Sequence, residues 1–211
     1  MGKLIEQLAP EYGFTVHVRI DVNDSLLEAR GADVGVEFST PETAAGNAEA
    51  LAELGVPSVV GTTGWLAELD RVRSAVERNQ TALVWSPNFS IGVNVFFRLV
   101  REAAKMLSDH PQYGAWAWEI HHRTKKDAPS GTLLKLVEEM KAAGYTRPVD
   151  ATANRAGTHP GTHEIGFDSA ADTITLRHTA RNREGFALGA VKAAEWIAGK
   201  TGFHEFGDIL F

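Results

Sequence analysis

Two adjacent histidines and a lysine stand close together in the stretch from residue 119 to residue 132. Histidine is the residue type whose side chain ordinarily titrates nearest to neutral pH, so His121 and His122 can exchange a proton. Lys125 carries an ammonium group that can donate a proton. A preceding apolar segment predicts that the histidines lie at the end of a strand, where the chain enters a loop. Because successive strand residues face opposite sides, only one of the two histidines can face a given cleft while the strand lasts.

The same stretch ends in the residues Ser130-Gly131-Thr132, which are typical of the start of a helix. Ser130 is a plausible N-cap, so the backbone N–H groups of Gly131 and Thr132 would point out of the helix, where an anion is favoured. Together with the imidazoles and the ammonium group, this spacing predicts a cradle for a carboxylate or phosphate beside a proton donor.

Each part also has an ordinary explanation. Paired histidines can be polar residues at a strand end, a single lysine is most often solvated, and Ser130 can be only a helix cap. A metal site is not predicted, since no cysteine or paired acid stands at ligand spacing. The combination of all parts favours the functional interpretation.

The elements that must position this stretch fall into two patterns. In the first half, strands alternate with helices, which is typical of a parallel sheet covered by helices. We expect strands at 14–20, 34–38, 56–60 and 82–85, and helices at 2–9, 42–54 and 65–78. Parallel sheets bind ligands at the carboxyl ends of their strands. Asp21, Ser39, Gly61–Thr63 and Pro87–Phe89 stand at such ends.

The second half has a different rhythm. A long helix is expected at 91–107, a strand at 115–121 and a helix from 131 to 143, followed by strands at 152–155, 163–168 and 173–178 and a helix at 186–198. The last two strands form a predicted hairpin, so this half is an α+β region with a mixed or antiparallel sheet. We therefore predict one domain of residues 1–89 with 184–211, and a second domain of residues 90–183.

Composition narrows the function classes. A formal net charge of −6 over 211 residues argues against general nucleic-acid affinity. The absence of cysteine excludes disulfides and thiolate catalysis. No apolar run reaches the roughly 20 residues of a membrane span, and the N-terminus lacks a signal-peptide core, so we expect a cytoplasmic protein.

The stretch from Glu119 to Thr132, EIHHRTKKDAPSGT, resembles the signature of the dihydrodipicolinate reductase family (4-hydroxy-tetrahydrodipicolinate reductase). Shorter similarities cover most of the chain, at Glu37–Pro41, Gly61–Gly64, Ser86–Asn94, and Arg183 with Phe186–Ala190.

The resemblance implies a Rossmann-type cofactor domain and a substrate domain with an open mixed sheet that builds a homotetramer. It implies hydride transfer from NADH or NADPH to a cyclic dicarboxylate in diaminopimelate and lysine biosynthesis. By motif match, His121 and Lys125 are similar to the catalytic residues, and His122, Gly131 and Thr132 to the substrate-binding ones.

The resemblance also implies the cofactor-binding positions. Asp21 matches the acid that holds the adenosine ribose, Met1 stands at the tail of the family's glycine loop, and the loops around the nicotinamide match Gly61, Thr62, Thr63, Ser86, Pro87, Asn88 and Phe89. Val22 stands where an arginine would hold a 2′-phosphate, so NADH is favoured over NADPH.

The chain departs from the family at its beginning. The family opens with a strand and a Gly-x-x-Gly loop, whereas this sequence opens at Met1-Gly2-Lys3 and matches only the tail of that motif. The alternatives are a start further upstream, a trimmed chain, or a variant with a smaller cofactor domain. The rival function is a catalytically silent homologue that binds a dicarboxylate and has lost dinucleotide binding.

Overall fold

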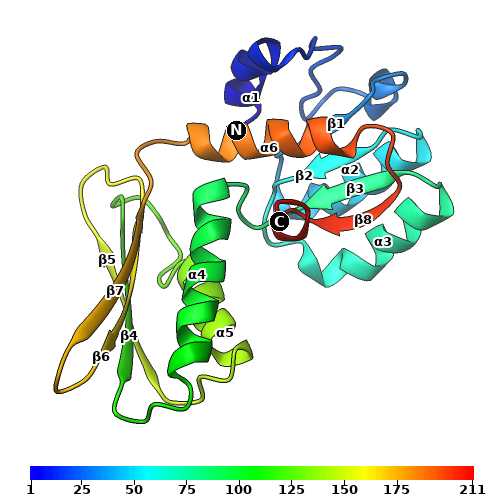
Figure 1. Cartoon of the computed structure of the whole chain (residues 1–211). Coiled ribbons are helices and arrows are strands. Elements are labelled where there is room, and N and C mark those ends of the chain that lie inside the picture. The colour runs from blue at the N-terminus through cyan, green and yellow to red at the C-terminus, as the bar shows by residue number, and fades with distance from the viewer. The chain divides into compact units, whose positions relative to one another are not determined.

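A parallel sheet and a mixed sheet form the centres of two separate units (Figure 1). The computed structural model describes residues 1–211. Unit 1 comprises Met1–Ser90 and Phe186–Phe211, and unit 2 comprises Ile91–Gly185.

Sheet A of unit 1 has the strand order β1-β2-β3-β8, and every pair of neighbours is parallel. Its strands are β1 (Gly35–Glu37), β2 (Ser58–Val60), β3 (Ala82–Trp85) and β8 (Gly202–Glu205). The helices of unit 1 are α1 (Gly2–Leu8), η1 (Ala9–Tyr12), η2 (Leu26–Ala29), α2 (Pro41–Glu53), η3 (Leu66–Glu68), α3 (Leu69–Arg78), α6 (Glu184–Ile197) and α7 (Phe206–Ile209). The prediction of a Rossmann-type parallel sheet is confirmed.

Alanine-rich and valine-rich faces make the core of unit 1. Pro41 occupies the first turn of α2, where its missing N–H costs nothing, and buried alanines follow along one face of that helix. They pack with Trp65, with Val72 of α3 and with Val60 and Leu83 of the sheet. The strands that lie between helices are almost wholly apolar, as parallel strands covered on both faces must be.

The predicted strand at Phe14–Ile20 is wrong. No strand is present there, although Phe14, Val18 and Ile20 alternate with polar residues. Alternation makes a strand only when a neighbour completes the ladder of backbone hydrogen bonds, and no strand of sheet A pairs with this segment. The segment is exposed or half-buried along its length.

Unit 2 is built on sheet B, with the strand order β5-β4-β6-β7. Its elements are α4 (Ile91–Leu107), β4 (Gly114–His121), α5 (Gly131–Ala142), β5 (Val149–Arg155), β6 (Thr162–Asp168) and β7 (Thr173–Thr179). β4 runs parallel to β5 and antiparallel to β6, and β6 and β7 form the predicted hairpin. The mixed sheet is therefore confirmed.

Helices α4 and α5 pack on one face of sheet B (Figure 1). The core between them includes Phe96 and Val100 of α4, Leu136 of α5, and Ile165 and Phe167 of β6. The other face of the sheet carries Trp116 and Trp118, which belong to alternate positions of β4.

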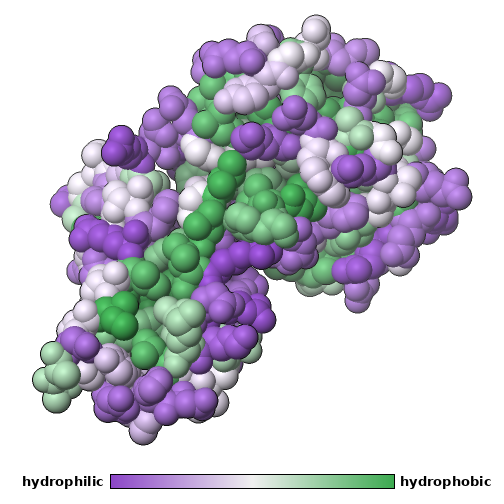
Figure 2. Space-filling view, viewed as in Figure 1, coloured by the Kyte–Doolittle hydropathy of each residue, from purple (hydrophilic) through white to green (hydrophobic).

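The outer surface of α4 is also partly apolar. Val95, Leu99 and Met106 are exposed along this helix. In Figure 2 apolar residues run over the part of the surface where α4 lies in Figure 1. Neither this helix nor any other is long and apolar enough to span a membrane.

Candidate active site

Strand β4 of unit 2 delivers two polar side chains to the helix-covered face of sheet B. Its residues are alternately buried and half-buried, so Glu119 and His121 both point inward. The strand ends at His121, and His122 is the first residue of the following loop, where its Nδ1 lies 2.8 Å from the hydroxyl of Thr124. The two adjacent histidines therefore occupy different surroundings.

Glu119 is fully buried, with a relative exposure of 0%. Its carboxylate accepts hydrogen bonds from the backbone N–H of Ser130 at 2.9 Å, from Nη2 of Arg155 at 2.8 Å, and from the Ser130 hydroxyl. Nε2 of His163 lies 3.2 Å from the same group. Burial alone would raise the pKa of Glu119, but the bonds from His163, Ser130 and Arg155 hold this pKa well below its usual range. The carboxylate is therefore ionised throughout the neutral range.

The imidazole of His121 is 8% exposed, and its Nδ1 is buried without a hydrogen-bond partner, 3.6 Å from Glu119. Burial lowers the pKa of His121 to about 4, because desolvation opposes the charged form. The Glu119 carboxylate works against this change, whereas His163, Lys125 and Arg155 add to it. His121 is therefore neutral at pH 7 in the free protein.

Gly161 makes room for that imidazole. An ideal Cβ at this residue would lie 2.9 Å from Nε2 of His121, and its φ of +139° disfavours other residue types. The backbone of Gly161 therefore packs directly against the ring.

The start of α5 is a capped helix N-terminus. Ser130 is the N-cap, and its hydroxyl accepts a hydrogen bond from the N–H of Leu133 at 3.2 Å. Gly131 and Thr132 are the first two residues of the helix, and a Cβ at Gly131 would meet nothing within 4 Å. A helix N-terminus is favourable for a carboxylate.

Lys125 is held by a neighbour in the loop. Its Nζ lies 2.7 Å and 2.8 Å from the two carboxylate oxygens of Asp127, which is itself half exposed. Burial raises the pKa of Asp127, but the Lys125 ammonium and the Gly131 N–H lower this pKa by more, so the net change is downward. Asp127 thus pairs with donors that a ligand carboxylate would also use.

The side chains of Glu119, His121 and His163 offer atoms within 4.8 Å of one another, which suits a metal ion by distance alone. The carboxylate already accepts hydrogen bonds from Ser130 and Arg155, and the Arg155 guanidinium balances its charge. We therefore interpret the group as a hydrogen-bonded cluster.

A second candidate region lies in unit 1, at the carboxyl ends of β1 and β2. A cavity of about 320 Å³ is lined by Met1, Phe38, Ser39, Pro41, Gly61, Thr62 and Thr63. The hydroxyl of Thr62 is buried and has no partner, and an ideal Cβ at Gly61 would lie 2.9 Å from Cε2 of the Phe38 ring. Four of the predicted cofactor-binding residues, Met1, Gly61, Thr62 and Thr63, thus meet at one cavity.

The other predicted cofactor residues are placed elsewhere in unit 1. Asp21 lies in an exposed turn, where its N–H donates to Asp24 and its carboxylate accepts from Val22 at 2.8 Å each. Ser86, Pro87 and Asn88 form the loop after β3, tied by a 2.8 Å bond from the Ser86 hydroxyl to the carbonyl of Asn88. The ring of Phe89 is buried, with its centroid 4.8 Å from that of Phe206 and 6.2 Å from that of Phe38.

Sequence reasoning missed Glu119, Arg155, His163 and Gly161 as members of the site. Arg155 and His163 come from neighbouring strands and join β4 through the registers His121–Arg155 and Glu119–His163. The one available signal was a glutamate two residues before His121, which places it on the same face of the strand.

Comparisons with known proteins give the family. Residues 2–89 match the family described as dihydrodipicolinate reductase, N-terminus, and residues 92–210 match dihydrodipicolinate reductase, C-terminus. A protein named 4-hydroxy-tetrahydrodipicolinate reductase from Archaeoglobus fulgidus is 41% identical over 100% of this chain and 95% of its own length. One of the same name from Christiangramia forsetii is 34% identical over 100% of this chain and 93% of its own length.

A solved structure, dipicolinate-bound dihydrodipicolinate reductase from Paenisporosarcina sp. TG-14, shares the fold. Its TM-score is 0.72 at 22% identity, over 84% of this chain and 73% of that one. Two family matches that together span nearly the whole sequence, and relatives above 30% identity, lead to one conclusion: the chain belongs to the dihydrodipicolinate reductase family.

Proposed function

We propose that this protein uses NADH or NADPH to reduce 4-hydroxy-tetrahydrodipicolinate to tetrahydrodipicolinate, a step of diaminopimelate and lysine biosynthesis. One observation carries the proposal: in unit 2 a buried imidazole at the end of β4, an ammonium group and a helix N-terminus lie within a few residues of one another in the chain. Membership of the family supports the same assignment.

The substrate is a dianion, and the donors of unit 2 suit it. One carboxylate binds at the N-terminus of α5, to the N–H groups of Gly131 and Thr132. His122 and Lys125 supply further donors from the loop after β4. The substrate carboxylate then competes with Asp127 for the Lys125 ammonium and for the Gly131 N–H.

Proton delivery is assigned to His121 and Lys125. Negative charge grows on the substrate as hydride arrives, and a general acid within reach neutralises it. Lys125 is the donor that is charged in the free protein. His121 is neutral there, and the approach of the dianion raises its pKa from about 4, which favours uptake of a proton when substrate is bound.

Unit 1 is assigned the dinucleotide. Hydride is the chemistry that a reduced nicotinamide dinucleotide supplies when bound. The cavity of Met1, Gly61, Thr62 and Thr63 fits this group, because Thr62 offers a buried hydroxyl with no partner. The loop of Ser86–Phe89 belongs to the same proposed site.

NADH is the preferred dinucleotide in this proposal. Asp21 and Asp24 place two carboxylates in one exposed turn, where they would repel a 2′-phosphate. Arg19, the cation next to this turn in sequence, is ion-paired with Glu6. Catalytic efficiency should be higher with NADH than with NADPH, and Asp21→Ser should narrow the difference. Equal or better efficiency of the parent protein with NADPH contradicts this preference.

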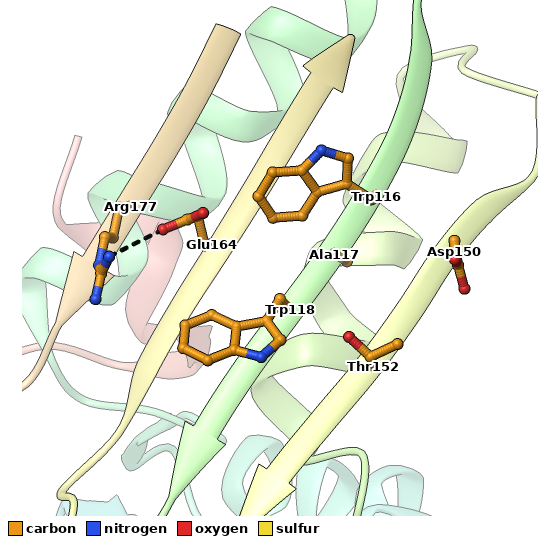
Figure 3. A pocket seen from close by; sticks show the side chains of 7 residues that line it. All are labelled: Trp116, Ala117, Trp118, Asp150, Thr152, Glu164 and Arg177. Atoms are coloured by element: carbon orange, nitrogen blue, oxygen red, sulfur yellow. Dashed lines mark hydrogen bonds and ion pairs between the residues drawn. The ribbon is translucent and has the colours of Figure 1, made fainter. Parts of the chain in front are cut away.

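Unit 2 is also assigned the subunit contact of a homotetramer, through the open face of sheet B. A cavity of about 480 Å³ on that face is lined by Trp116, Ala117, Trp118, Asp150, Thr152, Glu164 and Arg177 (Figure 3). Two tryptophans on an uncovered sheet are typical of a contact surface. In Figure 3 both indoles stand on the same side of the sheet as the Glu164–Arg177 ion pair.

Light scattering tests the assembly. We expect four times the chain mass of 22.9 kDa for the parent, and a smaller species for Trp118→Glu. The matched control is Leu99→Glu on the exposed side of α4, which should leave the mass unchanged. Loss of assembly in the Leu99 variant alone would assign the contact to the helix instead.

The reductase is tested by loss of absorbance at 340 nm with the product of the preceding synthase. Turnover supports the proposal. Calorimetry with pyridine-2,6-dicarboxylate and, separately, with NADH distinguishes the silent homologue, which would bind the dicarboxylate and not NADH.

A further inference from the structure

Glu119 connects all the parts of the substrate region in unit 2. Through its carboxylate it is bonded to both the backbone and the side chain of Ser130, the residue that begins α5. It is bonded to Arg155, whose Nη2 also donates to the backbone carbonyl of Asp127 in the loop. It lies next to the rings of His121 and His163, whose centroids are 5.1 Å apart.

Because the Glu119 carboxylate is buried away from solvent, its hydrogen-bond partners determine its position. Strand β4 carries both Glu119 and His121, and the register of sheet B places His163 directly opposite Glu119. The bonds to Ser130 then attach the start of α5 to the same strand. In this way Glu119 fixes the distance between the imidazole of His121 and the anion-binding helix start at Ser130, which are nine residues apart in sequence.

We propose that Glu119 is a positioning residue for the reductase reaction: its carboxylate locks the N-terminus of α5 to the imidazole of His121, so that the bound dicarboxylate meets its proton donor at a fixed place. The inference rests on the proposed function of this site. Glu119 itself touches neither substrate nor cofactor in this role.

The charge of Glu119 has a second effect on His121. Of the groups that face this imidazole, His163, Lys125 and Arg155 disfavour its protonated form, and Glu119 alone favours it. A neutral residue at position 119 would leave three groups acting in the same direction as burial. Glu119 therefore favours the protonated form of His121, an effect that a purely structural role would not require.

The test compares Glu119→Gln with Glu139→Gln. Glu139 lies in the same unit and loses ion pairs to Arg101 and Lys135, far along α5 from its N-terminus. Three quantities are measured on the full chain: kcat with NADH, the Kd of pyridine-2,6-dicarboxylate, and the NMR titration midpoint of His121 in that complex.

For Glu119→Gln we expect kcat to fall about 10- to 100-fold, as for other residues that orient a functional group. The dicarboxylate Kd should rise, and the His121 midpoint should move about one pH unit lower, as expected when an opposite charge is removed. Glu139→Gln should leave all three within about twofold or a few tenths of a pH unit, as is usual away from such a feature. A folded Glu119→Gln protein with unchanged kcat and midpoint overturns the proposal.

Two outcomes separate this inference from the function on which it rests. If the parent binds the dicarboxylate but turns nothing over, the reductase assignment fails, while the Kd and the midpoint still test Glu119. If Glu119→Gln does not fold, Ser130→Ala removes only one of its links. That variant should weaken dicarboxylate binding and keep the His121 midpoint, and unchanged binding would overturn the proposal.

Discussion

Replacing Gly189 with alanine tests how unit 1 joins α6 to the loop after β3. An ideal Cβ at Gly189 would lie 2.8 Å from the carbonyl carbon of Phe89, nearer still to its oxygen, and 3.3 Å from Cζ of Phe206. The obstacle is backbone, which cannot rotate away as the end of a flexible side chain would. Relief requires movement of either α6 or the chain around Phe89.

The expected size of the effect follows from two opposing terms. Alanine in the interior of a helix is about 1 kcal/mol more favourable than glycine. Overpacking a filled interior costs about 1–3 kcal/mol, and a collision with backbone belongs at the upper end of that range. Gly189→Ala should therefore lower the free energy of unfolding by about 2 kcal/mol.

Gly46 provides the matched control, because it lies inside α2 and a Cβ there would meet nothing within 4 Å. Gly46→Ala should raise stability by up to about 1 kcal/mol, so the two variants should differ by about 3 kcal/mol. Urea unfolding followed by circular dichroism and by tryptophan fluorescence measures both. If Gly189→Ala were as stable as Gly46→Ala, the close approach of α6 to Phe89 would be refuted.

Three further predictions concern unit 2. Lys125→Ala should lower kcat about 100-fold or more with little change in NADH affinity, as expected when a general acid is lost. The control Lys126→Ala should leave kcat unchanged. Equal kcat values for the two variants would make Lys125 an ordinary solvated lysine. The pKa of His121 falls from 6.5 to about 4 on folding, so the unfolded chain binds more protons than the folded chain between these two pH values. About 3 kcal/mol of the free energy of unfolding is therefore lost as the pH falls from 6.5 to 4. His121→Gln should show a smaller loss in urea titrations over that window, and an identical pH dependence would contradict the burial of a neutral imidazole. Arg147→Met should lower the free energy of unfolding by about 2 kcal/mol, because the guanidinium donates to the carbonyls of Leu107, Ser108 and Tyr113 at and after the C-terminal end of α4. An unchanged melting temperature would contradict this stabilising role of Arg147.

Local patterns predicted most elements of this fold. The apolar spacing of residues 91–107 gave the bounds of α4, and Ser130 proved to be the N-cap of α5 with the expected side-chain bond. These features depend on residues near in sequence, whose periodicity and capping chemistry can be read directly.

Features that depend on distant partners were not predicted. Phe14–Ile20 has strand periodicity without a neighbouring strand, whereas the short β8 is a strand because β3 accepts it as a parallel partner. The same reason explains why Arg155 and His163 were not predicted as site residues, since they reach Glu119 only through the register of sheet B. The pairing of β4 with β5 and β6 joins segments far apart in sequence, and the pattern of each segment alone does not give it.

The two units differ in how they are distributed along the chain, and this has a consequence for synthesis. Unit 2 is one continuous segment, Ile91–Gly185, so all of its strands are synthesised before α6 is complete. Unit 1 needs both ends of the chain, because β8 is the partner of β3 and closes sheet A. During translation from the N-terminus, the middle of the protein can thus acquire its native sheet first, and the earliest residues to be made must wait for the last.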